Sequence, residues 1–450
     1  MTTTDPAPSR SSSWLPRWDP NDPAFWEAEG KARAWRTLAV TTFSLTLAFA
    51  VWFMVSAIVV RLNDIGFSLS QGQLFWLTAM PGLAAGITRL AHMFFVPMYG
   101  SRHTLTLGTL SLLIPAIGWG VAVQNPNTSF TTFMILAFLA GMGGGNFSSF
   151  MPSTSLFFPK KMQGTALGIQ AGIGNFGVSL VQFLTPWVVG VNLFWFLGSD
   201  SERWTWAGRT SDIWLQNAAW VYIPWLLLGA ALSWLVVRSV PIKANFGQQF
   251  AIFRDKHTWV MTSIYMMTFG AFSGLAAAFP LLIKNLYGGF ENAPLPLKFA
   301  FLGPLIGSAV RVLFGLIADK TGGAVLTSIS AVGMAVCALL VTPYLTPSSL
   351  EQFPLFVAAM LGIFFFSGIG NASTFRQMPI IFNPPQSAGV IGWTAAIAAF
   401  GPFIVSMSLS AITAATGNAR LFFYLLAAFC VLNLGLNWYF YGRKGAEKPS

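Results

Sequence analysis

Uninterrupted apolar runs of about 20 residues recur along this 450-residue chain. A run of that length spans the hydrocarbon core of a bilayer as an α-helix. The composition agrees, because 54% of the residues are hydrophobic and 9% are charged, whereas soluble domains carry about 25% charged residues. Membrane β-strands are shorter and alternate polar with apolar residues. The pattern therefore predicts an all-α polytopic membrane protein.

We predict twelve membrane-spanning helices, without a connection long enough to fold as a soluble domain. The longest predicted loops are 192–215 and 239–256. The second of these loops is basic and follows the sixth helix, so it divides the chain into two six-helix halves. The twelve helices are predicted at 37–60, 73–98, 103–123, 130–153, 163–191, 216–238, 257–284, 297–318, 322–345, 353–379, 386–413 and 419–441.

The distribution of lysine and arginine predicts the orientation in the membrane. With the N-terminus inside, seventeen of the 25 Lys and Arg residues fall on the cytoplasmic side, six on the other side and two within helices. This positive-inside bias places both termini in the cytoplasm. We expect the first 20 residues to be disordered. The predicted domains are a tail at 1–36, helical halves at 37–238 and 257–441, a linker at 239–256 and a tail at 442–450.

The sequence also argues against several classes of protein. The net charge of +11 follows from the positive-inside bias, so we expect no nucleic-acid partner. Cys337 and Cys430 are the only cysteines, which is too few for a metal site. The sequence contains neither a His/Cys/Asp cluster nor a nucleotide-binding loop. We therefore expect no metal, no cofactor and no enzyme activity.

The two halves of the chain resemble each other. GGNFSSF, which ends at Phe150, pairs with IGNASTF, which ends at Phe375, and TAMPGLAAGITR pairs loosely with AFLGPLIGSAVR, so that Arg89 corresponds to Arg311. Two six-helix halves related by a parallel repeat describe the major facilitator architecture. In that architecture the substrate binds near the midplane between the halves, which rock to expose it to either side.

Arg89 and Arg311 are the only basic residues well inside predicted helices. Arginine at the centre of a membrane helix costs about 3 kcal/mol on insertion scales, so each needs an ion pair, a route to the interface or a polar cavity. All fourteen acidic residues lie in tails, loops or helix ends, and the best placed, Asp64 and Asp319, are assigned to loops. We therefore predict that both arginines face a central cavity. Their forked donors suit a small oxyanion.

The remainder of such a site would be neutral. Asn146 and Asn175 are candidates because a buried amide needs a polar partner. Tyr265 and Phe269 are four residues apart and share a helix face, where aromatic side chains serve either packing or substrate contact. The glycine-rich stretches GMGGGNFSSF and GTALGIQAGIGNFG fit close helix packing as well as a substrate path.

Two long stretches carry a resemblance to a known family, GMGGGNFSSFMPSTSLFFPKKMQGTALGIQAGIGNFGVS and SGIGNASTFRQMPIIF. Over nearly its whole length, including RWDPNDPAFW, the sequence resembles the nitrate/nitrite porters of the major facilitator superfamily, the NarK type. The resemblance implies a transporter in the inner membrane of a bacterium. Its partners would be nitrate, nitrite and the lipid bilayer, and we expect it to function as a monomer.

The resemblance also implies which residues bind the substrate. The family's site has two arginines that bind the anion, two phenylalanines that hold its flat faces, an asparagine, a tyrosine and a hydroxyl residue. The hydroxyl residue here is a threonine where family members carry serine. The matching positions, in that order, are Arg89 and Arg311, Phe147 and Phe269, Asn175, Tyr265, and Thr394.

Two transport mechanisms remain open. An anion would offset the cost of enclosing two unpaired guanidinium groups, so an occupied carrier would switch sides more readily than an empty one, which favours nitrate/nitrite exchange. Nitrate–proton symport would need a titratable group in the path. His92, the one histidine away from the ends of a predicted helix, is either that group or a neutral, hydrogen-bonded side chain. A carrier for another small oxyanion is the less specific alternative.

Overall fold

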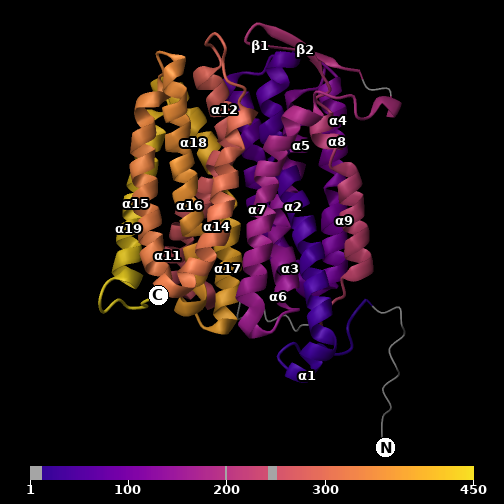
Figure 1. Cartoon of the computed structure of the whole chain (residues 1–450), viewed down its shortest axis with the longest axis vertical. Helices are drawn as coiled ribbons and strands as arrows, with labels where there is room; N and C mark the ends of the chain where they lie inside the picture. The colour runs from indigo at the N-terminus through magenta and orange to yellow at the C-terminus, as the bar shows by residue number, and fades with distance from the viewer. Residues whose placement is uncertain (1–12, 198–199, 242–250) are drawn as a thin grey trace, which may run out of the picture.

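The computed structural model describes residues 13–197, 200–241 and 251–450. Figure 1 shows one bundle of helices, with the helices of the first half on one side and those of the second half on the other. Helix α1 (Pro23–Phe25) and the C-terminus lie at one end, which we call the tail end. A small hairpin of strands β1 (Glu202–Trp206) and β2 (Arg209–Ile213) lies at the opposite end, which we call the hairpin end.

The helices follow the predicted order along the chain. In the first half they are α2 (Lys31–Leu62), α3 (Gln71–Ser111), α4 (Leu113–Gln124), α5 (Phe130–Gly145), α6 (Phe147–Ser155), α7 (Lys160–Val188), α8 (Asn217–Trp220) and α9 (Ile223–Val236). In the second half they are α11 (Lys256–Tyr265), α12 (Ala271–Tyr287), α13 (Leu297–Ala300), α14 (Leu302–Thr321), α15 (Gly323–Val341), α16 (Phe353–Ile381), α17 (Pro384–Ala398), α18 (Gly401–Thr416) and α19 (Arg420–Asn437).

The number of spans agrees with the prediction once one long helix is divided. Among the described residues, eleven helical segments are long and apolar enough to cross a membrane, and one of them, Gln71–Gln124, has 54 residues. Its backbone leaves the helix at Gly100, where φ is 75° and ψ is 161°, a conformation that favours glycine. The predicted second and third spans therefore meet at a sharp bend instead of a loop. Asp319, which we assigned to a loop, belongs to the last turn of α14.

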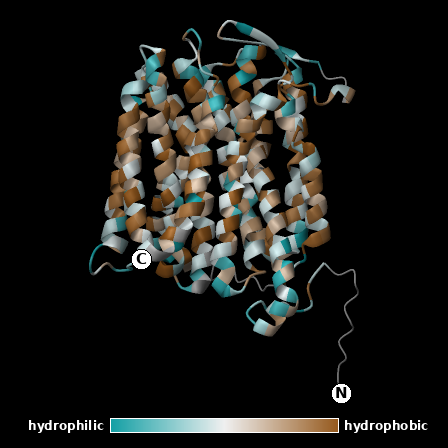
Figure 2. Ribbon diagram, viewed as in Figure 1, coloured by the Kyte–Doolittle hydropathy of each residue, from teal (hydrophilic) through white to brown (hydrophobic). Residues whose placement is uncertain are grey.

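The outer surface of the bundle is apolar along its middle. Figure 2 shows hydrophobic residues on the flanks of the bundle and hydrophilic residues concentrated at its two ends. Leu107, Leu235 and Val431 are among the large apolar side chains exposed on this surface. Exposed apolar residues in such number suit contact with lipid chains and would be unfavourable in water.

The N-terminal tail packs against the tail end of the bundle. The backbone nitrogen of Leu15 donates to the Ser239 carbonyl over 2.8 Å, and the Trp18 indole lies 5.0 Å from the Phe157 ring. The prediction that the first 20 residues are disordered is therefore wrong for residues 13–20. Residues 1–12 lie outside the described residues, as do residues 242–250 of the predicted linker.

The predicted outer loop 192–215 contains a secondary structure that we did not predict. Strands β1 and β2 pair antiparallel, with Trp206 opposite Arg209, and the turn between them has positive φ at Ala207 and Gly208, as short hairpin turns require. The indole nitrogen of Trp206 donates to the Ala293 carbonyl over 3.2 Å. The hairpin thus belongs to the first half of the chain but contacts a loop of the second half.

The two halves pack closely toward the hairpin end. A side chain at Gly82 would overlap the backbone at Phe403, and one at Gly86 would overlap the Phe400 ring, so these glycines allow α3 to approach α18. An ion pair adds to this contact: Lys284 Nζ of α12 lies 2.6 Å from Asp64 Oδ1 and 2.6 Å from the Val60 carbonyl. Both charged side chains are mostly buried, with 15% and 14% exposed.

We expect Lys284→Gln to open the hairpin end more often, because it removes one partner of a partly desolvated ion pair between the halves. A loss of about 1–2 kcal/mol would raise the exposed population roughly tenfold. The measurement is the rate at which a membrane-impermeant maleimide labels Ser56→Cys, with the two native cysteines replaced. Ser56 is 5% exposed and lines a small pocket with Ala277 and Pro402.

The matched control is Lys298→Gln, because Lys298 is an exposed lysine at the same end. It should leave the labelling rate unchanged. Equal labelling in the Lys284→Gln and Lys298→Gln proteins would show that the ion pair does not hold the halves together.

Candidate functional site

Arg89 lies in the core of the bundle, on α3, with no exposed surface. Its Nε donates to the Gly144 carbonyl over 2.8 Å, and its Nη1 donates to the Ala395 carbonyl over 2.6 Å. Nη2 has no hydrogen-bond partner among the described residues. Since Ala395 belongs to α17, Arg89 connects the two halves and still has a free donor.

Three aromatic rings surround the Arg89 guanidinium. Its central carbon is 4.6 Å from the centre of the Phe147 ring and 5.5 Å from the Trp52 and Phe269 rings. Phe147 begins α6 in the first half, whereas Phe269 belongs to the π-helical turn η5 (Met266–Gly270) in the second. The structure therefore brings Phe147 and Phe269 together at one guanidinium, as a pair of rings holding a flat anion would require.

Arg311 has a similar environment on α14. It is 6% exposed, its central carbon is 4.9 Å from the centre of the Phe375 ring, and its Nη1 has no partner among the described residues. Phe375 is a neighbour that we did not predict for the site. The internal repeat had already pointed to Phe375 by pairing it with Phe150.

Tyr265 connects the surroundings of the two arginines. Its ring stacks on Phe269 with centroids 5.4 Å apart and an interplanar angle of 6°, and it lies 5.1 Å from Phe375. Phe269 in turn lies 5.5 Å from the central carbon of Arg89, and Phe375 lies 4.9 Å from that of Arg311. The predicted arginine pair and aromatic pair thus form one cluster.

The positive charge of this cluster is not balanced by a carboxylate of the described residues. Within the described part of the chain, neither Arg89 nor Arg311 takes part in an ion pair with a carboxylate. The best-placed acid, Asp64, pairs with Lys284 at the hairpin end instead. Enclosing an uncompensated charge costs several kcal/mol, and a small anion between the arginines would reduce that cost.

Two buried asparagines have side chains without partners. Asn175 of α7, which we predicted, is 1% exposed, and neither polar atom of its amide is hydrogen-bonded within the described residues. Asn371 of α16, which we did not predict, is fully buried and equally unsatisfied. Buried amides normally have partners. Helix α7 packs against α14, and α16 packs against η5, so both asparagines belong to elements that border the cluster.

Asn146 and Thr394 form hydrogen bonds within the protein. The Asn146 amide nitrogen donates to the Gly108 carbonyl over 3.0 Å, at the break between α5 and α6. The Thr394 hydroxyl donates within its own helix, to the Val390 carbonyl over 2.8 Å. Thr394 nevertheless precedes Ala395, whose carbonyl Arg89 contacts. In this conformation the amide nitrogen of Asn146 and the hydroxyl proton of Thr394 are both already engaged.

The glycines of α5 serve close packing. A side chain at Gly143 would overlap the Ala48 carbonyl, and one at Gly145 would overlap Thr88. His92, one turn from Arg89, is 7% exposed, and its Nδ1 lies 2.9 Å from the Ser149 hydroxyl. This hydrogen bond agrees with the interpretation of His92 as a hydrogen-bonded side chain.

Comparison with known proteins assigns the chain to a family. Residues 40–381 match the model of the Major Facilitator Superfamily. The chain is 59% identical, over 442 residues, to the probable nitrate/nitrite antiporter NarK2 of Thermus thermophilus, an alignment that covers 98% of this chain and 99% of that one. This chain belongs to the NarK-type nitrate/nitrite porters. The match also confirms the predicted twelve-helix major facilitator fold and a transporter instead of an enzyme.

Further relatives of this NarK-type porter agree. It is 36% identical over 464 residues to the nitrate/nitrite transporter NarU of Escherichia coli, covering 97% of this chain and 98% of that one. Among solved structures, the xylose transporter XylE of E. coli in a partially occluded inward-open conformation matches with a TM-score of 0.66 and 16% identity. That alignment covers 91% of this chain and 98% of XylE, and it supports the fold alone.

We expect Arg89→Lys and Arg311→Lys each to weaken nitrate binding to this NarK-type porter by at least about tenfold. Lysine keeps the charge but lacks the planar fork that binds two oxygens at once, and a factor of ten corresponds to about 1.4 kcal/mol. The measurement is calorimetric titration of the purified proteins with nitrate. Arg203→Lys, on the exposed face of the hairpin, is the control and should bind as the unaltered chain does. Full affinity in both central variants would exclude forked recognition.

Proposed function

We propose that this NarK-type porter exchanges nitrate for nitrite across the inner membrane of a bacterium by alternating access. The observation that carries the proposal is the pair of buried guanidinium groups, Arg89 and Arg311, each with an unpartnered nitrogen and without an ion pair in the described chain. The names of the relatives in Thermus thermophilus and E. coli support the choice of anions.

The geometry supports a binding pose for a flat anion. Nitrate would lie between Phe147 and Phe269 and accept hydrogen bonds from guanidinium nitrogens at its edge. Tyr265 and Asn175 would donate to its remaining oxygens. Nitrite presents nearly the same edge with one oxygen fewer, so the same groups can hold either anion.

Exchange follows from the cost of closing an empty carrier. Arg89 already bonds to Ala395 across the halves, so closing the halves encloses its charge together with that of Arg311. An anion between them offsets the loss of hydration, and the occupied carrier therefore changes sides more readily. Exchange of two monovalent anions also moves no net charge, which avoids the opposing membrane potential of about 2.3 kcal/mol per 100 mV.

The moving bodies of this mechanism would be the halves 37–238 and 257–441, with the connecting loop 239–256 in the cytoplasm. We propose that the tail end faces the cytoplasm and the hairpin end faces the periplasm, as the distribution of basic residues favours. A single chain contains both arginines and their aromatic neighbours, so we propose that the monomer is the transporting unit.

Nitrate–proton symport is the second candidate. It would require a group that gains and loses a proton along the path. His92 is one turn from Arg89 but shares a hydrogen bond with Ser149, so its Nδ1 is already engaged. The lack of a carboxylate paired with either central arginine in the described chain also favours exchange over symport.

We expect proteoliposomes containing this porter to take up nitrate only when they are preloaded with nitrite, because the empty carrier switches slowly. A protonophore should have no effect, and His92→Gln should exchange at the rate of the unaltered protein. The measurement is uptake of isotopically labelled nitrate with and without internal nitrite. Uptake into empty vesicles driven by a proton gradient would replace exchange with symport.

We expect Phe147→Ala to reduce the uptake of flat nitrate strongly. The same change should reduce less the ability of a tetrahedral anion such as phosphate to inhibit that uptake. A flat ion loses contact over a whole face when the ring is removed, whereas a tetrahedral ion makes less use of that face. The readout is the ratio of nitrate uptake to phosphate inhibition, compared with Phe183→Ala, which removes an exposed ring on α7. An equal ratio in the two variants would favour a less specific oxyanion carrier.

A further inference from the structure

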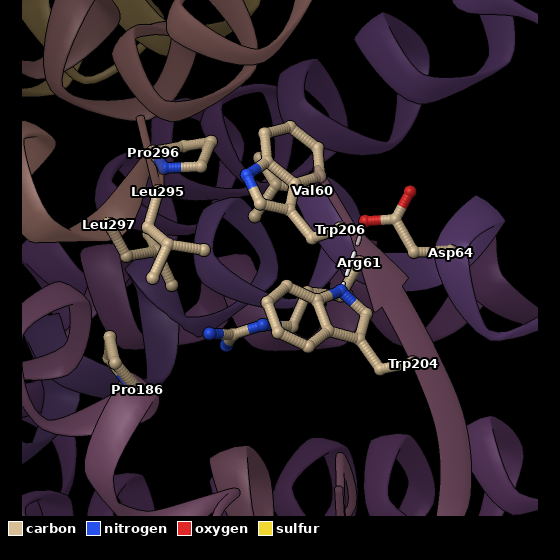
Figure 3. A pocket seen from close by; sticks show the side chains of 9 residues that line it. All are labelled: Val60, Arg61, Asp64, Pro186, Trp204, Trp206, Leu295, Pro296 and Leu297. Atoms are coloured by element: carbon tan, nitrogen blue, oxygen red, sulfur yellow. Dashed lines mark hydrogen bonds between the residues drawn. The ribbon is translucent and has the colours of Figure 1, made fainter. Parts of the chain in front are cut away.

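A pocket at the hairpin end contains an arginine that the mechanism above does not use. The pocket is small and partly open to the outside, so only a ligand of a few atoms could enter it. Figure 3 shows the side chains that line it, from both halves of the bundle and from the hairpin. They include Val60, Arg61 and Pro186, the hairpin residues Trp204 and Trp206, and residues 295–297.

Arg61 is buried in this pocket and forms no salt bridge within the described residues. It lies in the last turn of α2, is 8% exposed, and its Nη1 has no hydrogen-bond partner in the described chain. Asp64 attracts Arg61 electrostatically but makes no salt bridge with it. Its Oδ1 is 2.6 Å from Lys284 Nζ and its Oδ2 is 3.3 Å from Trp204 Nε1. Figure 3 shows the guanidinium extending across the pocket toward the side lined by Pro186, away from Asp64.

The chemistry of this pocket resembles that of the central cluster. The Arg61 guanidinium lies 5.7 Å from the Trp204 ring centre, as that of Arg89 lies against Phe147. Lys284 and Asp64 neutralise each other. The charge of Arg61 then gives this region one net positive charge. A guanidinium with free donors and an aromatic face binds small oxyanions in preference to spherical ions.

We propose that this pocket is a second anion site, in which Arg61 and Trp204 hold one small oxyanion of the nitrate type. This proposal rests on the function proposed above, because the ligand of the second site is the anion that the porter is proposed to carry. Because the pocket is lined by both halves, the site is complete only while the hairpin end is closed. On the proposed orientation it lies on the periplasmic side, separate from the central arginines.

The test is calorimetric titration with nitrate in chloride-free detergent solution without added lipid. The unaltered protein should bind about two nitrate ions per chain, and Arg61→Gln about one. Arg203→Gln removes the same charge from the exposed face of the same hairpin and should keep both sites. An unchanged stoichiometry in Arg61→Gln would overturn the proposal.

A second set of variants tests the outer site by itself. The Arg89→Ala/Arg311→Ala protein should still bind about one nitrate ion, and addition of Arg61→Gln should abolish that binding. If the double variant is folded, as shown by a monodisperse elution profile, and binds no nitrate, the proposal is wrong. Arg61→Lys retains the charge without the fork, and it should weaken the outer site in a protein that folds normally.

Failure of the proposed function would give a different pattern. In that case Arg61→Gln would bind no nitrate and the unaltered protein would not exchange it, while the double central variant would still bind one ion. A lipid phosphate is another source of the same oxyanion chemistry. If phosphatidylglycerol binds to the double central variant and nitrate does not, the pocket holds a lipid headgroup and the proposal of a free-anion site is overturned.

Discussion

Two guanidinium groups without carboxylate partners are the constraint on which the centre of this porter depends. Arg89 and Arg311 are nearly or fully buried, and the described chain does not pair either of them with an acid. Each unpaired charge raises the free energy of an empty, closed carrier by several kcal/mol. A protein with this core therefore needs a mobile anion to close easily, and this need links substrate binding to the conformational change.

The surroundings of Arg89 show how the fold keeps such a charge tolerable without neutralising it. Carbonyl groups of Gly144 and Ala395 accept two of its hydrogen bonds, and the faces of Phe147 and Phe269 provide favourable cation–π contacts. These groups lower the cost of burial but carry no formal charge, so they leave room for an anion. Since Ala395 and Phe269 belong to the second half, the contacts also depend on how the halves are arranged.

The two halves resemble each other in sequence but differ in local structure at corresponding positions. Asn146 and Asn371 occupy corresponding positions, yet Asn146 lies at a break between α5 and α6 and donates to Gly108, whereas Asn371 lies inside the continuous helix α16 with an unsatisfied amide. Likewise, the π-helical turn that carries Phe269 belongs to the second half. Such turns often mark functional sites, and here the turn places an aromatic ring of one half against an arginine of the other.

The sequence by itself determined that the chain lies in a membrane, how many helices it has, where it divides into halves and which two arginines are central. Each of these follows from the length of apolar runs or from a charge inside such a run, and both are local properties of the chain. The resemblance added Phe147 and assigned substrate contact to Phe269 and Tyr265, and the structure brings these rings to the arginines. Only the tertiary structure decided which polar groups are already satisfied. It engaged the amide nitrogen of Asn146 and the hydroxyl of Thr394 in hydrogen bonds and left Asn371 without a partner. It also folded a predicted loop into a hairpin and left Arg61 unpaired while Asp64 joined Lys284. The last of these outcomes depends on a contact between residues 220 positions apart, and the satisfaction of a polar group depends on which atoms surround it in space, which local patterns of sequence do not encode.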